Sequence, residues 1–101
     1  MRFDVHPQAQ EELQGLPEEV QEELISEIES RKKRHNSIIK QRGTGISYDQ
    51  HGEPVHYLKL ETADQDYRVF FQPSGQTVVV VGVRLRDDDT YTNLRDITGR
   101  E

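Results

Sequence analysis

The clearest pattern of apolar and polar positions lies in the second half of the chain, where apolar residues recur at every second position. Residues 55–60, 67–72 and 77–86 show it, and a period of two is typical of β-strands. Residues 62–66 and 73–76 join these segments, and connections this short suit hairpins and exclude parallel crossovers. The pattern therefore predicts an antiparallel meander.

The first third of the chain has a helical pattern that follows a short alternating segment. Residues 2–6 alternate and predict a further strand of the same sheet. Pro7 favours the start of a helix that ends at Gly15, and Pro17 opens a second helix that we expect to run to about His35. An apolar stripe surrounded by glutamates lies on this second helix, at Val20, Leu24, Ile25 and Ile28. The two helices predict a hairpin on the core face of the sheet.

The remaining segments complete the predicted fold. Residues 36–54 show no periodicity and predict a long connection, which is often functional or mobile. The aspartates at residues 87–89 favour the capping of a short final helix from Thr90 to about Ile97. We expect a single α+β domain over residues 1–101, with a twisted antiparallel sheet of about four strands, the helical hairpin on one face and a short C-terminal helix.

The alternation also predicts which residues share a face, because successive side chains of a strand point to opposite sides. In the third strand of the meander, one predicted face carries Val79, Val81, Val83 and Leu85, and the other carries Val78, Val80, Arg84 and Arg86. The first two strands add cations to the face of the arginines. The sequence therefore predicts convergence of Lys59, Arg68, Arg84 and Arg86 on one face.

Charge sharpens this picture, because the chain as a whole is acidic and has a formal net charge of −6. Residues 1–30 carry a net charge of −8, residues 31–60 carry +5 and residues 61–101 carry −3. Such a protein is repelled by nucleic acid at long range, but a local basic surface can bind phosphate at contact. The basic run of residues 31–34 has the charge that a helix C-terminus prefers, and a phosphate contact is its alternative role.

Several classes of function are disfavoured by what the sequence lacks. The absence of cysteine excludes a disulfide framework and thiolate metal sites, and it fits a reducing compartment. The four histidines follow no recognised ligand spacing, so we expect neither a metal nor a cofactor. The longest apolar run, residues 78–81, is far too short to cross a bilayer. We therefore expect a cytoplasmic protein without a membrane partner.

The cationic face has two chemical interpretations. In the first, its arginines pair with nearby carboxylates, and such surface pairs contribute only ~0 to 1 kcal/mol. In the second, the face binds an anion, since guanidinium groups offer paired donors to phosphate and stay protonated. A lysine among cations loses its proton more readily, so Lys59 is a candidate base. Tyr91 follows the last strand closely and is a candidate for stacking on a nucleobase.

The order of the predicted elements along the chain, from the first strand through the helical hairpin, the long loop and the meander to Tyr91, resembles that of the RelE/ParE superfamily of toxin–antitoxin toxins. The resemblance spans nearly the whole chain, and its most specific parts are Tyr67-Arg68 and the valine-rich residues 78–83 that lead to Arg84 and then Tyr91. For the RelE branch it implies ribosome-dependent endoribonuclease activity, in which a nucleotide's 2′-hydroxyl attacks the adjacent phosphate of mRNA in the A site. It also implies an antitoxin that wraps the cationic face.

The resemblance implies a role for each candidate residue. Lys59 is the candidate base, Arg68 and Arg84 hold the phosphate, and Tyr91 orients a base by stacking. Further candidates for contact with RNA are Arg86, Arg31, Lys32, Lys33 and Arg34. Tyr57 stands where RelE members often carry another basic residue.

Two other functions stay open at this point. A ParE-like protein would inhibit DNA gyrase by binding it and would cleave nothing, whereas a catalytically silent homologue would only bind a partner. The combination of Lys59, Arg68, Arg84 and Tyr91 favours the ribonuclease, since a gyrase inhibitor has no need of that set.

Overall fold

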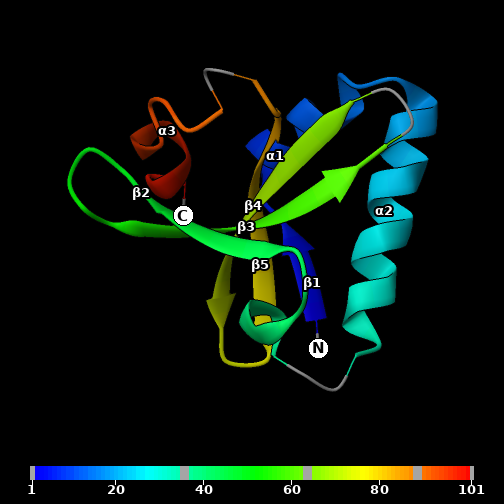
Figure 1. The fold of residues 1–101 in the computed structure, drawn as a ribbon, viewed down its shortest axis with the longest axis horizontal. Helices are drawn as coiled ribbons and strands as arrows, with labels where there is room; N and C mark the ends of the chain where they lie inside the picture. The colour runs from blue at the N-terminus through cyan, green and yellow to red at the C-terminus, as the bar shows by residue number, and fades with distance from the viewer. Residues whose placement is uncertain (1, 35–36, 63–64, 88–89, 101) are drawn as a thin grey trace.

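The alternating segments pair into one sheet. A computed structural model describes residues 2–34, 37–62, 65–87 and 90–100 and contains a five-stranded sheet in the order β1-β5-β4-β3-β2 (Figure 1). The strands are β1 (Arg2–Val5), β2 (Thr44–Tyr48), β3 (Pro54–Glu61), β4 (Asp66–Ser74) and β5 (Thr77–Leu85). The helices are α1 (Pro7–Gln14), α2 (Glu18–Lys32), the short 3-10 helix η1 (Ile38–Lys40) and α3 (Arg95–Thr98). The predicted meander is confirmed, because β3, β4 and β5 are antiparallel neighbours.

The sheet is mixed, whereas the sequence predicted an antiparallel one. β1 runs parallel to β5, with Arg2 opposite Thr77 and Val5 opposite Val80. Many residues separate these two strands along the chain, including both N-terminal helices, so no tight turn forces them to run in opposite directions. The predicted α+β class, with helices early in the chain and a short C-terminal helix, is confirmed with one more strand than expected.

The additional strand, β2, lies in the segment where no element was predicted. It is an edge strand and pairs antiparallel with β3, placing Gly45 opposite Tyr57. A Cβ atom at Gly45 would lie 2.5 Å from the Tyr57 ring, so the absence of a side chain lets this ring lie across β2. Because glycine takes this position, the sequence of β2 shows too few apolar residues to reveal a strand.

A β-bulge in the β4–β5 pair changes which residues of β5 share a face. Phe70 lies opposite Gly82, whereas the next residue, Phe71, lies opposite Val80. Val81 is therefore an extra residue on β5, and the alternation of side chains changes phase there.

The sheet carries an apolar cluster on each face, and the bulge determines which valines of β5 belong to each cluster. The cluster under α1 and α2 includes Leu58, Leu60, Val69, Val78, Val80 and Val83. The cluster on the other face contains Val55, Phe70, Val81, Leu94 and Ile97, with Val79 packed against it. The predicted grouping of Val79 and Val81 with Val83 was wrong, because a strict alternation of residue types does not reveal an inserted residue.

The N-terminal helices form the predicted hairpin against the larger cluster. α1 begins at Pro7, and α2 follows Pro17 and ends at Lys32; His35, the predicted end, lies outside the described residues. Only Leu24 and Arg31 of α2 are buried, so this helix covers the sheet sparingly. Across the described ranges, every helix is too short or too polar to span a membrane.

The C-terminal segment covers the other face and contains less helix than predicted. α3 begins only at Arg95, and residues 90–94 form turns. Asn93 has a left-handed φ of 51°, which a continuous right-handed helix cannot contain. Of the aspartates expected to cap this helix, Asp88 and Asp89 lie outside the described residues. In Figure 1, α3 lies on the opposite side of the sheet from α2.

Candidate functional site

Three cations form a row across three neighbouring strands. Lys59 on β3 lies directly opposite Arg68 on β4, and Arg68 lies directly opposite Arg84 on β5. Residues in such positions have Cβ atoms about 4.5–5.5 Å apart on the same face of a sheet. Their strand neighbours Leu58 and Val69 point under α1 and α2, so these cations point to the face that the C-terminal segment covers. We call Lys59, Arg68 and Arg84 the cationic row.

The cationic row has no carboxylate partner among the described residues. The ion pairs of the described ranges involve other cations, namely Arg2, Arg31, Lys32, Arg95 and Arg100. Lys59 is exposed, and Arg68 and Arg84 are half-buried. Like charges directly opposite each other destabilise a sheet. The row therefore maintains a positive surface at some cost in stability, as a site for an anion would.

Arg68, the middle residue of the cationic row, is held in place by neutral groups. Its Nε donates a hydrogen bond to the Tyr91 hydroxyl oxygen at 3.1 Å, and its Nη1 donates to the Tyr67 carbonyl at 3.1 Å. Both acceptors are uncharged, so the guanidinium keeps its full charge while its orientation is fixed. Arg68 is thus suited to hold an anion without rearrangement.

Arg84 makes contacts that suit a structural role. Its Nη1 donates to the carbonyls of Thr90 at 2.9 Å and Thr92 at 2.5 Å, and its Nη2 donates to that of Asn93 at 3.4 Å. Burial lowers the pKa of Arg84, while the charge of Glu12 opposes that shift. The guanidinium thus holds the turn that carries Tyr91, whereas the sequence analysis assigned it to the phosphate.

Tyr91 lies within a packed aromatic group. Its ring centroid lies 5.4 Å from that of Tyr57 and 6.3 Å from that of Phe70. The guanidinium carbon of the exposed Arg86 lies over the same ring, 5.5 Å from its centroid. The structure therefore joins Tyr91 to Arg68 through its hydroxyl and to Arg86 through its ring. The predicted stacking on a base would have to displace Arg86 or use another part of the ring.

Tyr57 belongs to this group, although the sequence analysis gave it no role. It lies two residues before Lys59 on β3 and therefore on the same face, and the absence of a side chain at Gly45 makes room for its ring. Burial raises the pKa of Tyr57, and a hydrogen bond with the Tyr91 side chain raises it further. Its signal in the sequence was the period of two, which places Tyr57 and Lys59 side by side.

The segment that carries Tyr91 is anchored at its far end by a buried carboxylate. Asp49, in the loop after β2, accepts a hydrogen bond from the Thr98 hydroxyl at 2.7 Å and others from the backbone N–H groups of His51 and Glu53. These bonds, that of Thr98 foremost, hold the pKa of Asp49 below its ordinary value. Arg95 adds an ion pair at 3.4 Å. The loop between β2 and β3 thereby fixes α3, a link that the sequence pattern gave no sign of.

The basic run at the end of α2 is separate from the cationic row. Arg31 is buried, and its guanidinium donates to Glu27 at 3.1 Å and to the Arg42 carbonyl at 2.6 Å. Burial lowers the pKa of Arg31, and the charge of Glu27 opposes this. These contacts give Arg31 a structural role, and its predicted contact with RNA stays a prediction. Lys32 pairs with Glu29 at 3.3 Å, and Lys33 and Arg34 are exposed near the end of α2, which packs on the other face.

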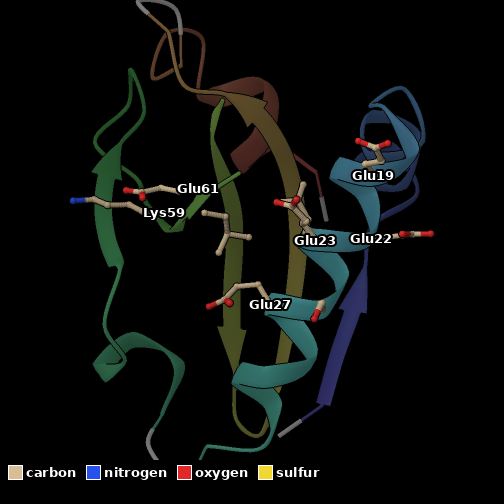
Figure 2. A pocket seen from close by; sticks show the side chains of 9 residues that line it. Glu19, Glu22, Glu23, Glu27, Lys59 and Glu61 are labelled. Atoms are coloured by element: carbon tan, nitrogen blue, oxygen red, sulfur yellow. The ribbon is translucent and has the colours of Figure 1, made fainter. Parts of the chain in front are cut away.

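Within the described ranges, the side chains of His, Asp and Glu form no group of three or more that could hold a metal ion. A groove of about 790 Å³ lies between α2 and β3, on the face that the helices cover, and Lys59 lines its edge (Figure 2). The cationic face itself offers one exposed ammonium group, two half-buried guanidinium groups and two aromatic rings beside them.

Comparison with known proteins does not assign the chain to a family. Its sequence matches no model of a known protein family, and no curated protein matches it at a significant level. Function therefore has to be inferred from the cationic row and its surroundings.

Proposed function

We propose that the chain is a RelE-like toxin of a type II toxin–antitoxin system, an endoribonuclease that cleaves mRNA on the ribosome. The observation that supports this most is the cationic row, which aligns Lys59, Arg68 and Arg84 across β3, β4 and β5 without a carboxylate partner among the described residues. Such a row suits the phosphates of RNA. The proposed place of action is the cytoplasm, and the proposed partner is an antitoxin that covers the row.

The proposed reaction cleaves RNA without a cofactor. The 2′-hydroxyl oxygen of a nucleotide forms a bond to the phosphorus on its 3′ side, and the bond from that phosphorus to the next 5′-oxygen breaks. Lys59 is the proposed acceptor of the proton of the 2′-hydroxyl. Arg68 donates to the phosphate oxygens as negative charge grows on them. A proton from water or from the lysine ends on the leaving oxygen, so the products are a 2′,3′-cyclic phosphate and a 5′-hydroxyl.

The contacts of Arg84 and Arg86 indicate what each arginine contributes to the proposed reaction. Arg84 holds the turn at residues 90–93 through three carbonyls, so it positions Tyr91 and adds positive charge near the phosphate. Arg86 is exposed and lies over the Tyr91 ring, so its guanidinium is available for the neighbouring phosphate.

The test is expression in cells and on purified ribosomes programmed with mRNA, with Arg68→Ala and Lys59→Ala as variants. We expect the unaltered chain to stop translation and cut mRNA in the A site, and each variant to slow cleavage by about 100-fold or more. Lys40→Ala is the matched control, because it removes an exposed cation that is outside the row and is not a candidate for contact with RNA, and we expect it to cleave at an unchanged rate. Circular dichroism checks that each variant is folded.

The alternative functions give different results in the same experiment. If mRNA stays intact and DNA supercoiling by gyrase is inhibited, the chain is a gyrase inhibitor and not a ribonuclease. If mRNA stays intact and growth is normal, the remaining interpretation is a catalytically silent protein that only binds a partner. Cleavage that persists in Arg68→Ala would also contradict the proposal, because another site would then carry the reaction.

A further inference from the structure

The groove between α2 and β3 combines apolar and acidic groups (Figure 2). Its volume is about 790 Å³, and the buried side chains of Leu24 and Leu60 contribute its apolar lining. The groove is also lined by five glutamates: Glu19, Glu22, Glu23 and Glu27 on α2, and Glu61 on β3. This size is in the range of about 300–1,000 Å³ that binding clefts show.

The negative charge of the groove is largely uncompensated within the chain. Of its glutamates, only Glu27 forms a salt bridge among the described residues, with Arg31. Lys59 is the one cation that lines the groove within the described ranges, and Figure 2 shows its amine pointing away from the glutamates of α2. Because like charges on adjacent turns of a helix repel each other, this arrangement favours a ligand that brings positive charge.

Exposed apolar side chains flank the same face. Ile25 on α2 is 47% exposed, and Ile46 and Tyr48 on the edge strand β2 are 45% and 60% exposed. Ile46 lies opposite His56, whose ring stacks on Phe71 of the core under the helices. Exposed apolar groups rimmed by charge are typical of surfaces that bind another protein.

We propose that this groove binds a basic amphipathic helix of a partner protein. Apolar residues on one side of such a helix lie over the nearly buried Leu24 and Leu60 at the floor of the groove, and lysines or arginines on its flanks meet the glutamates. A second copy of the chain fits less well, because its own α2 brings further glutamates to the contact. Leu60 points under α2, whereas Arg68 and Arg84 point to the other face of the sheet, so the bound helix meets the cationic row only at Lys59, at the edge of the groove. The proposal thus goes beyond the ribonuclease activity and does not depend on it.

The test uses a labelled amphipathic peptide of about 18 residues, with leucines on one face and lysines on the other, and measures its affinity by fluorescence anisotropy. We expect Glu23→Lys, which reverses a charge of the groove, and Ser26→Trp, which fills it, each to weaken binding by about tenfold, or about 1.4 kcal/mol. Ser26 lines the groove, and both residues are exposed on α2. Matched controls are Glu11→Lys on α1 and Ser30→Trp one turn farther along α2, both exposed and outside the groove. We expect these controls to bind like the unaltered chain.

Three outcomes would overturn the proposal. A scrambled peptide of the same composition that binds equally well would show only non-specific attraction between charges. Equal affinity for all four variants, or no binding at about 100 µM peptide, would remove the groove as a docking site. Sedimentation that shows a dimer, which Ser26→Trp dissociates, would assign the groove to a second copy of the chain.

Discussion

Arg84 decides the position of side chains that are distant from it in sequence. Its guanidinium joins the end of β5 to the carbonyls of Thr90, Thr92 and Asn93, and the turn that it holds places the Tyr91 hydroxyl against Arg68. Only a planar group with several donors can reach these carbonyls together. At the scale of single residues, the cationic row therefore contains two different kinds of cation. Lys59 is exposed and Arg68 is half-buried, and Arg84 supports the segment beside them.

We predict that Arg84→Ala lowers the free energy of unfolding by about 2 kcal/mol, because several hydrogen bonds from a charged donor are lost. Arg84→Lys should recover little of this, since an ammonium group cannot reproduce the fork of donors. Urea unfolding measures the effect. Arg86→Ala is the control, as this neighbouring arginine is exposed, and we expect a change below about 0.5 kcal/mol. Equal effects of the two substitutions would contradict the structural role of Arg84.

At the scale of elements, the loop between β2 and β3 works as the anchor of α3. Asp49 is buried, and its carboxylate accepts bonds from its own loop and from Thr98 of α3. Gly82 contributes from the other side, because a Cβ atom there would lie 2.9 Å from Ile97 of α3. The segment that carries Tyr91 is therefore clamped between β5 and a loop that is far away in sequence. The rigidity of the cationic face depends on the contact of Asp49 with α3 and on that of Gly82 with α3.

Because the carboxylate of Asp49 anchors α3, we predict that the folded chain loses stability in acid. The pKa of Asp49 is lower in the folded chain than its ordinary value of 3.8, so its contribution is fully present above about pH 5 and declines as the pH falls below that value toward the folded pKa. We expect Asp49→Asn to lower the melting temperature at neutral pH, and this difference from the unaltered chain should shrink below about pH 4. Thermal unfolding followed by circular dichroism from pH 7 to pH 3 measures it.

The control for this pH dependence is Asp66→Asn, which neutralises an exposed aspartate on β4. Its difference from the unaltered chain should be small throughout the range. If the Asp49→Asn difference instead stayed constant down to pH 3, the carboxylate would not be the group that acid disrupts.

At the scale of the whole molecule, charge is divided between two faces. The glutamates of α2 line the groove on one side of the sheet, and the cationic row lies on the other. The molecule measures 33 × 30 × 24 Å, so the screening length of about 30 Å at 0.01 M salt spans the whole molecule, whereas the value of about 8–10 Å at 0.1–0.15 M spans only part of it. The acidic face can thus repel RNA at low salt without touching it.

This separation predicts how RNA affinity responds to salt, on the premise that the cationic row binds RNA. Replacing Glu22 and Glu23 together by glutamine should strengthen the binding of a single-stranded RNA oligonucleotide several-fold at about 0.01 M salt, and should leave it unchanged at about 0.15 M. Fluorescence anisotropy at the two concentrations measures this. A similar gain at both concentrations would indicate that these glutamates touch the RNA directly.

Periodicity in the sequence was sufficient to predict the strands of the meander, the helical hairpin and the alignment of Lys59 with Arg68, because each depends on local alternation and short connections. Three features depend on contacts between distant segments and were decided only by the tertiary structure. The bulge at Val81 changes which valines face the helices, since an inserted residue leaves no mark on the pattern of residue types. The glycine of β2 is explained only by the ring of Tyr57 across from it. The roles of Arg31 and Arg84 follow from carbonyl groups that reach them only in the folded chain.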